Sequence, residues 1–203
     1  MSRLGATSHW RRWLALVLLL GGLQQLSVAA LIHAKAWLAP VLIDRAWSLT
    51  LAGGGALVKP WSWADTWPVA RLEVPALDVD LLVLAGDSGN ALAFGPGHAW
   101  ASAALGSPGL AVIGGHRDTH FAFLRDLWIG AQLQLQLADG RRRAYRVEAL
   151  EIVDASRERL PAGRGEESLW LVTCYPFDAL LANGPLRYVV HASPVAPEDP
   201  GAT

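Results

Sequence analysis

Cysteine-based acyl transfer is the chemistry that the residue types and spacing in the second half of the chain suggest. Cys174 is the only cysteine; it follows the apolar run Leu169–Thr173 and precedes Pro176, which cannot continue a paired strand. The thiol is therefore expected at a strand end, where a rigid scaffold often presents reactive groups. It becomes a nucleophile as the thiolate, which a nearby imidazole or cation favours.

His116 occupies a matching position. It follows the apolar run Leu110–Ile113 and two glycines, so it is also expected in a loop at a strand end. An imidazole there can act as general acid and general base. A histidine after a strand is by itself more often a surface or capping residue, and the pairing with the sole cysteine is what favours catalysis.

Arg187 opens another apolar run, which ends at Ala192. If this strand neighbours the one ending at Cys174, the guanidinium lies beside the thiol and can stabilise both the thiolate and a developing oxyanion. Without that neighbour, Arg187 is an ordinary charge on an edge strand. The residues alone leave both possibilities open.

A metal site is the main chemical alternative. His116 and His120 have the spacing of a ligand pair on a helix. The two preceding glycines disfavour a helix, and Arg117 stands where an HExxH motif needs its glutamate. We therefore expect no metal and no cofactor. Asp118 is a candidate for orienting His116, although an exposed loop carboxylate fits the sequence equally well.

The composition favours an exported protein at a membrane over a nucleic-acid binder. The 203 residues include 17 basic and 18 acidic ones, giving a net charge of -1, so no attraction to nucleic acid is expected. Apolar residues make up 52% and charged residues 17%, with ten tryptophans. This length suits one domain with a core and a short extra element.

Near the N-terminus, the run Trp13–Ile32 is apolar and has the roughly twenty residues that a membrane-spanning helix needs. Three arginines precede it: Arg3, Arg11 and Arg12. The positive-inside rule then places the N-terminus in the cytoplasm and the rest outside. Small residues at 27–29 and 34–36 are also compatible with a cleaved signal peptide. In both cases the following domain is exported, where a lone thiol risks unwanted pairing unless it is used.

After Pro68 the chain reads as short strands separated by turn residues, as in a mainly β sandwich or barrel. The expected strands are 69–74, 79–84, 110–113, 133–137, 144–153, 169–173 and 187–192. Strict alternation over Gln132–Leu137 followed by Asp139–Gly140 predicts a hairpin. Apolar spacing over Phe121–Leu127 predicts a short helix, and Arg141–Arg143 is expected on a solvated hairpin face.

The resulting organisation has five parts. Helix-like sequence continues through Leu49 and is broken by Gly53–Gly55, so the region before Pro68 is interpreted as a stalk. Its tryptophans can rest on the lipid interface or pack against the domain, and the sequence leaves this open. We expect a cytoplasmic N-terminus (1–12), a transmembrane anchor (13–32), a juxtamembrane stalk (33–67), a catalytic domain (68–193) and a disordered tail (194–203).

Three motifs together resemble the sortase superfamily. They are Gly-His-Arg-Asp-Thr-His-Phe at 115–121, Leu-Val-Thr-Cys-Tyr-Pro-Phe at 171–177 and Arg-Tyr-Val-Val at 187–190. The likeness runs from about Arg71 to Ala192 and includes Gly95–His98. Within the superfamily the chain most resembles the class of Gram-negative bacteria, through the Lys35-Ala36-Trp37 region and the residues after the cysteine.

The resemblance implies an eight-stranded β-barrel and a membrane-anchored cysteine transpeptidase. It assigns Cys174 as nucleophile, His116 as general acid and base, and Arg187 as the group that stabilises oxyanion and thiolate. The implied substrate is a protein with a C-terminal LPxTG-like sorting signal, transferred through a thioacyl-enzyme to an amine acceptor at the bacterial inner membrane. His120 matches no essential role.

Three other functions stay open. A cysteine endopeptidase would use water as its normal acceptor. A membrane-tethered β-domain that only binds an envelope partner would need no reactive Cys174. A metal-dependent hydrolase would use His116 and His120.

Overall fold

The structure is a computed structural model that describes residues 6–157, 165–179 and 184–195. The chain divides into two compact units, Met1–Val41 and Leu42–Thr203. Of the predicted disordered tail, Pro194 closes the last strand and the Val195 N–H donates to the Ala144 carbonyl at 2.8 Å. Residues 196–203 of that tail lie outside the described residues.

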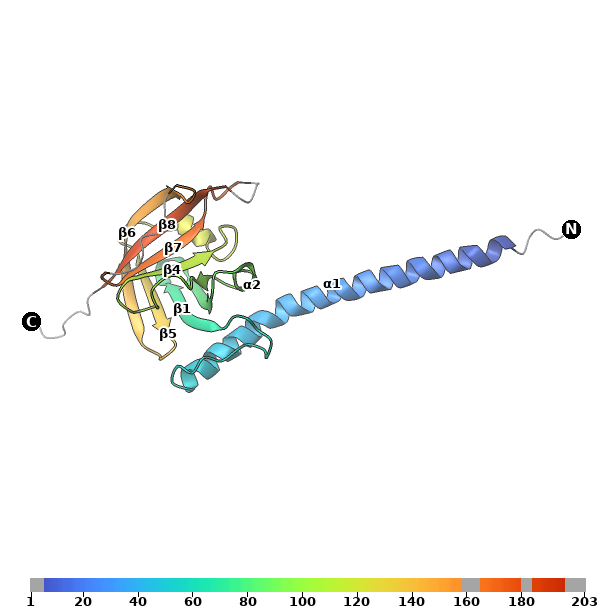
Figure 1. The fold of residues 1–203 in the computed structure, drawn as a ribbon, viewed down its shortest axis with the longest axis horizontal. Helices are drawn as coiled ribbons and strands as arrows, with labels where there is room; N and C mark the ends of the chain where they lie inside the picture. Colours follow the sequence, from blue (N-terminus) through green and yellow to red (C-terminus); the bar gives the residue numbers. More distant parts are fainter. Residues whose placement is uncertain (1–5, 158–164, 180–183, 196–203) are drawn as a thin grey trace, which may run out of the picture. The chain divides into compact units, whose positions relative to one another are not determined.

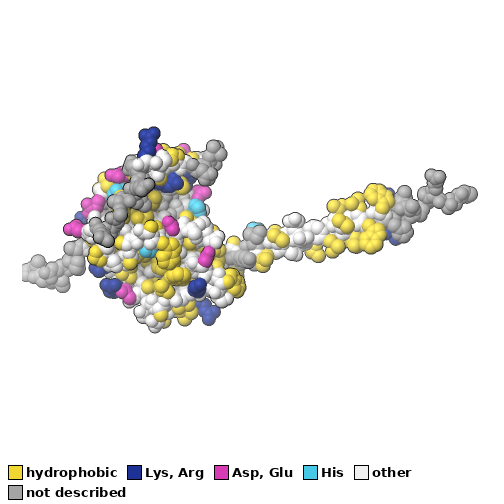
Figure 2. Space-filling view, viewed as in Figure 1, with side chains coloured by type: hydrophobic (Ala, Val, Ile, Leu, Met, Phe, Trp, Pro, Cys, Tyr) yellow, Lys and Arg dark blue, Asp and Glu magenta, His cyan; other side chains and the backbone are white. Residues whose placement is uncertain are grey.

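The first unit consists mainly of one long helix, α1 (Ala6–Ala52), which continues into the second unit. Its stretch from Trp10 is long and apolar enough to cross a membrane, and a signal sequence meets the same criterion. Apolar side chains cover much of the helix surface toward its N-terminal end (Figure 2). The helix also runs through the predicted stalk as far as the Gly53–Gly55 break.

The last turns of α1 are part of the second unit. Ile43, Ala46 and Trp47 are buried there. The Asp44 carboxylate lies 3.2 Å from the guanidinium of Arg71, which pairs with Asp80 as well. The end of the helix is thus fixed to the first two strands of the sheet.

The second unit is a closed barrel of eight strands in the order β1-β2-β3-β4-β7-β8-β6-β5 (Figure 1). The strands are β1 (Pro68–Val74), β2 (Val79–Ala85), β3 (Gly97–His98), β4 (Leu110–Gly115), β5 (Gln132–Leu137), β6 (Arg142–Asp154), β7 (Ser168–Cys174) and β8 (Leu186–Pro194). Three short helices accompany them: η1 (Pro75–Leu77), α2 (Gly89–Leu92) and η2 (Ala122–Asp126). The prediction of a mainly β, eight-stranded barrel with short helices is confirmed.

The residue pattern located seven of the eight strands. The missing one, β3, has two residues, too few for any alternation to show. It pairs with β2 and β4, and a Cβ at Gly97 would overlap the Gly86 carbonyl, so glycine is required there. The helix predicted over 121–127 is present as the shorter 3-10 helix η2.

Alternating side chains build the core. In β5 the side chains of Leu133, Leu135 and Leu137 are buried inside the barrel and the glutamines between them face outward. The predicted turn follows: Gly140 has φ +86°, and its N–H donates to the Leu137 carbonyl at 2.9 Å. Phe121, at the N-cap of η2, is buried in the same core.

Strand directions decide which loops meet. Because β4 and β7 are parallel, they end at the same end of the barrel. Strand β8 is antiparallel to β7 and therefore begins there. This end of the barrel, where β4 and β7 end and β8 begins, is called the Cys174 end below.

Candidate active site

Cys174 and Arg187 face each other across the β7–β8 ladder. They are direct partners in the antiparallel register, Cys174 at the last position of β7 and Arg187 at the second position of β8. Directly opposite residues on neighbouring strands have Cβ atoms about 4.5–5.5 Å apart. The neighbour relation on which the interpretation of Arg187 depended is therefore present.

His116 is brought to the same place by the parallel pairing of β4 with β7. Gly115 is the partner of Thr173, so the next residue on each strand is His116 and Cys174 respectively. The hydroxyl of Thr173, which is buried, donates to the Gly115 carbonyl at 2.7 Å. This side-chain bond fixes the ends of the two strands against each other.

The site lies on the outer surface of the barrel. Leu169, Leu171 and Thr173 are buried and alternate with half-buried residues, so Cys174 faces outward. Gly114, the partner of outward-facing Val172, has no atom within 4 Å of the position where a Cβ would lie. Among the described residues, the space over Gly114 on the outer face of β4 is therefore open.

The Arg187 guanidinium is held by the backbone of its own turn. Its Nη1 donates to the carbonyls of Gly184 at 2.7 Å and Leu186 at 2.9 Å. Both bonds use the same nitrogen. Within the described chain, Nε and Nη2 make no hydrogen bond and can donate to an oxygen of a bound ligand.

Arg117, part of the motif at 115–121, has a structural role that its departure from a zinc motif does not indicate. Its Nη2 donates to the Ala179 carbonyl at 2.7 Å, joining the loop after β4 to the loop after β7. The Phe121 N–H closes the first loop with a bond to the His116 carbonyl at 2.9 Å. The two loops that carry the candidate residues are thus held together, a contact over 62 residues of sequence that no local pattern signals.

An aromatic cluster supports the loop after Cys174. The rings of Tyr175 and Tyr188 stack at 6.3 Å, and Phe177 meets Tyr188 edge to face at 5.2 Å. Arg125 of η2 lies over the Phe177 ring at 5.2 Å. Burial, and secondarily the nearby Tyr175, raises the pKa of Tyr188, so this phenol stays protonated at neutral pH.

His120 and Asp118 lie in a turn, not on a helix. Burial, and secondarily the charge of His116, lowers the pKa of His120, which favours its neutral form. Asp118 is exposed and makes no hydrogen bond to His116 in the described chain. Among the described residues, no three histidine, cysteine, aspartate or glutamate side chains group as metal ligands.

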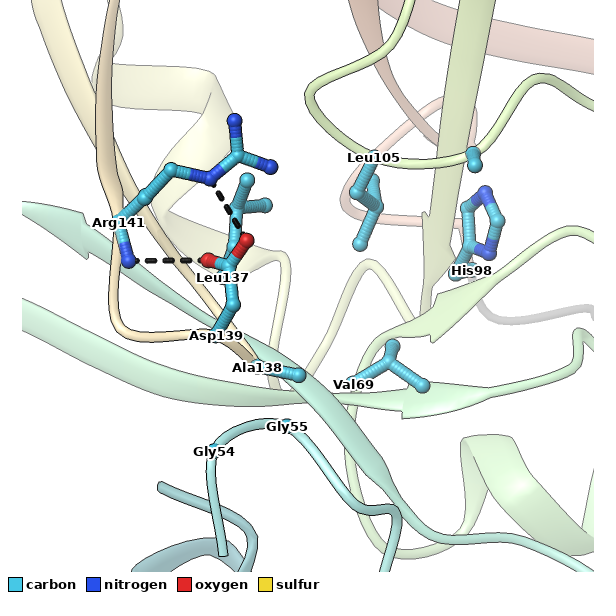
Figure 3. A pocket seen from close by; sticks show the side chains of 10 residues that line it. Gly54, Gly55, Val69, His98, Leu105, Leu137, Ala138, Asp139 and Arg141 are labelled. Atoms are coloured by element: carbon cyan, nitrogen blue, oxygen red, sulfur yellow. Dashed lines mark hydrogen bonds and ion pairs between the residues drawn. The ribbon is translucent and has the colours of Figure 1, made fainter. Parts of the chain in front are cut away.

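A pocket of about 390 Å³ lies elsewhere, at the barrel end opposite the Cys174 end (Figure 3). It is lined by Val69 at the start of β1, Leu137 at the end of β5, and His98, whose Nε2 lies 2.8 Å from the Ala103 carbonyl. None of the three candidate residues contributes to it. The three candidate residues come together at the Cys174 end of the barrel instead.

With this geometry established, comparison with known proteins identifies the family. A family model described as the Sortase domain matches residues 72–195. This range begins inside β1, at Leu72, and contains the rest of the barrel through β8 and all three candidate residues. The chain belongs to the sortase family, whose members are cysteine transpeptidases.

Individual relatives agree. The chain is 34% identical to Sortase D of Bacillus subtilis over 125 residues, which are 61% of this chain and 62% of that protein. The catalytic domain of SrtD from B. anthracis is 29% identical, with a TM-score of 0.54 over 64% of this chain and 88% of that one. Sortase A from Corynebacterium diphtheriae is 20% identical, with a TM-score of 0.60 over 90% and 98% of the two chains, a likeness of fold.

Proposed function

We propose that the protein is a membrane-anchored cysteine transpeptidase that cleaves a C-terminal LPxTG-like sorting signal and transfers the upstream protein to an amine. The observation that supports this most is the register of three strands, which brings Cys174, His116 and Arg187 to one end of the barrel. Family membership supports the same chemistry. The matched region covers less than two thirds of the B. subtilis relative, so activity and substrate are proposals for this chain.

In the first half-reaction the Cys174 thiolate attacks the carbonyl carbon of the scissile peptide bond. Arg187 donates hydrogen bonds to the resulting oxyanion through the guanidinium nitrogens that its backbone contacts leave available. The carbon–nitrogen bond then breaks, and protonated His116 gives its proton to the departing amine. A thioacyl-enzyme and a free C-terminal fragment result.

The second half-reaction regenerates the enzyme. An incoming amine attacks the thioester carbon and loses a proton to neutral His116. The carbon–sulfur bond breaks, Cys174 leaves as thiolate, and a new amide is formed. Water attacking in place of the amine would give a hydrolysed product and return the same enzyme.

We further propose that the run 13–32 anchors the protein in a bacterial inner membrane as a single pass. Arginines before this run support a cytoplasmic N-terminus, with the barrel on the periplasmic or extracellular side. Residues 33–67 would form the juxtamembrane stalk and 68–193 the catalytic domain. Enzyme and membrane-held substrate would then meet at high effective concentration. The Lys35-Ala36-Trp37 region supports placing the chain in the Gram-negative class.

The direct test is a product assay with the full chain in detergent micelles. An LPxTG-type peptide and a soluble amine are incubated with the wild type, Cys174→Ala, His116→Ala and Arg187→Ala. Mass spectrometry then separates amine-ligated from hydrolysed peptide. The proposal expects ligated product with the wild type and its loss in the Cys174 variant.

Each other outcome has a definite meaning. Hydrolysed peptide without ligation, even at high amine concentration, would identify a cysteine endopeptidase. Turnover that survives Cys174→Ala and disappears with a chelator would identify a metal-dependent hydrolase. No turnover of any sorting-type peptide, together with an unreactive Cys174 thiol in the folded protein, would favour a binding domain.

A further inference from the structure

The pocket at the barrel end opposite the Cys174 end has no part in the proposed reaction. Its volume of about 390 Å³ lies within the range of about 300–1,000 Å³ that small-molecule sites occupy. Separate segments of the chain wall it: the turn after α1 at Gly54–Gly55, the start of β1, the β3–β4 loop and the β5–β6 hairpin. All of them belong to the second unit, so the pocket is a feature of the barrel unit itself.

Apolar residues form the greater part of the lining. Leu137 is buried, and Val69 and Leu105 are partly buried and pack against the barrel core. Gly106, next to Leu105, has φ +72°, and a Cβ there would lie 2.6 Å from the Leu137 side chain. The β3–β4 loop is thus packed closely on the end of β5, and an apolar group placed on this floor is removed from water.

A guanidinium borders the apolar floor. The two oxygens of the Asp139 carboxylate accept one hydrogen bond each from Arg141, at 2.6 Å from Nε and at 3.0 Å from the backbone N–H (Figure 3). These bonds fix the side chain of Arg141 on its hairpin. The N–H groups of Nη1 and Nη2 make no hydrogen bond to any described residue, so they can donate to an anion.

One guanidinium binds two carboxylates elsewhere in this protein. Arg71 lies 3.2 Å from Asp44 through Nη2 and 3.4 Å from Asp80 through Nη1. Arg141 pairs with Asp139 through Nε, which leaves both terminal nitrogens for a second carboxylate. Because the available groups are donors in a planar fork, a carboxylate matches them in charge and in geometry.

His98 lies on the other side of the floor. Figure 3 shows the guanidinium of Arg141 and the imidazole of His98 on either side of Leu105. The Nε2 of His98 lies 2.8 Å from the Ala103 carbonyl, which only accepts, so Nε2 carries the hydrogen. Nδ1 has no hydrogen-bond partner in the part of the chain that the structure describes, and in the neutral ring it accepts. The pocket therefore combines donors, an apolar floor and an acceptor.

We infer that this pocket binds a small amphipathic carboxylate of the size of an N-acylated amino acid. Its carboxylate accepts hydrogen bonds from the terminal nitrogens of Arg141, and its apolar side chain lies on Leu105 and Leu137. Its amide N–H donates to Nδ1 of His98. A free acylated amino acid and the C-terminal residue of a peptide share this chemistry. The site binds without reacting, and it does not depend on the proposed transpeptidation.

Titration of the full chain in detergent micelles, with isotope-labelled valine and leucine methyl groups, tests the site by NMR. N-acetyl-leucine is the probe. Its matched ligands are N-acetyl-leucinamide, which lacks the carboxylate, and isocaproate, which lacks the amide. Arg141→Gln removes the guanidinium. Arg142→Gln is the matched control variant, since Arg142 is the next residue but pairs with Glu73 and does not line the pocket.

N-acetyl-leucine should shift the methyl signals of Val69, Leu105 and Leu137 with a Kd in the millimolar range, as expected for a ligand of this size. Isocaproate should bind several-fold more weakly, and N-acetyl-leucinamide should not bind. Arg141→Gln should weaken binding by about tenfold or more, because a hydrogen-bonded charge is lost. Arg142→Gln and Cys174→Ala should bind as the wild type does, which separates this site from the proposed catalysis.

Several results would overturn the inference. Equal affinity for N-acetyl-leucine and its amide would show that the carboxylate is not recognised, and this comparison needs no variant to fold. Unchanged affinity in Arg141→Gln would exclude the guanidinium. Shifts at Val172, two residues before Cys174, without shifts at the pocket methyl groups would place the ligand at the candidate active site. No shift at any methyl group would leave the pocket without this ligand.

A longer peptide that ends in leucine distinguishes the two sources of the ligand. Binding as tight as that of N-acetyl-leucine, or tighter, identifies a peptide C-terminus as the natural class. Much weaker binding of the peptide identifies a free acylated amino acid.

Discussion

Gly114 and Gly115 offer a matched pair of substitutions that tests how β4 positions His116. A Cβ at Gly115 would lie 2.7 Å from the ring of Phe121, which is buried and cannot swing away. At Gly114, one residue earlier on the same strand, a Cβ would meet nothing within 4 Å. Neither glycine has a positive φ, so alanine fits the backbone at both positions.

The expected magnitudes follow from that difference. Overpacking a core contact costs about 1–3 kcal/mol. Replacing glycine by alanine where space allows stabilises by about 0.4–1 kcal/mol through the unfolded chain. Gly115→Ala should therefore be less stable than the wild type, and Gly114→Ala as stable or slightly more so. A difference of 1 kcal/mol corresponds to about 2–4 °C in Tm for a chain of this size.

Activity should follow the same displacement. Relieving the contact to the ordinary 3.4 Å requires about 0.7 Å of movement, and the backbone of Gly115 is directly followed by His116. Misplacing a catalytic group by about 1 Å can cost up to about 10²-fold in rate. Gly115→Ala should lower kcat/KM well below the wild type.

Urea unfolding, Tm and peptide-cleavage kinetics of both variants in one detergent provide the measurement. We expect a clear gap in unfolding free energy between the two alanine variants. Equal stability, with Gly115→Ala retaining full activity, would refute the packing of Phe121 beneath Gly115 and the positioning role that we assign to it.

Three further predictions concern the same region. Thr173→Val should destabilise by about 1–3 kcal/mol because the carbonyl of half-buried Gly115 loses the hydrogen bond from the buried Thr173 hydroxyl, whereas Thr173→Ser should not. Urea unfolding of the two variants is the measurement. Arg187→Lys, which keeps the charge but loses the guanidinium geometry, should lower kcat about 10²–10³-fold with little change in KM, and full activity in peptide kinetics would contradict its role. Burial lowers the pKa of His120 and of His191 below the unfolded value near 6.5, so the contribution of these neutral histidines to the free energy of unfolding is fully present above that pH and is lost as the pH falls below it. His120→Gln should reduce this loss, measured by urea unfolding at pH values from 8 to 5. The same pH dependence in wild type and variant would exclude His120 as a contributor.

Much of the fold is predictable because its strands carry local signals. Alternation over Gln132–Leu137 and the Asp139–Gly140 turn specify a hairpin without tertiary information. Strand β3 could not be found in this way, since it is defined by its partners β2 and β4 and by the space that Gly97 leaves. A two-residue strand is a tertiary feature.

The candidate site divides in the same way. Residue type and strand-end position indicated Cys174 and His116. They indicated Arg187 only if its strand neighbours that of Cys174, and the resemblance supplied that condition. The contacts that hold these groups, Thr173 to Gly115 and Arg117 to Ala179, join residues 58 and 62 positions apart in the sequence. Such pairs follow from barrel closure, which no single segment encodes.

The tryptophans of the lead-in show a choice that only the structure could make. The sequence allowed them to pack on the domain or to rest on lipid. Trp67 packs against Trp100 and is half-buried, whereas Trp63 in the same segment is exposed. The bonds of Thr66 and Trp67 to Ala85 hold the backbone from which Trp67 packs on Trp100.

The central claim is that Cys174 forms a thioester with a sorting signal. Intact mass spectrometry of the full chain, mixed with an LPxTG-type peptide and quenched in acid before any amine is added, tests this most directly. We predict an added mass equal to the acyl fragment, mapped to the peptide containing Cys174, absent in Cys174→Ala and removed by hydroxylamine. An unmodified Cys174 while the peptide is cleaved, or an adduct that persists in Cys174→Ala, would contradict the account.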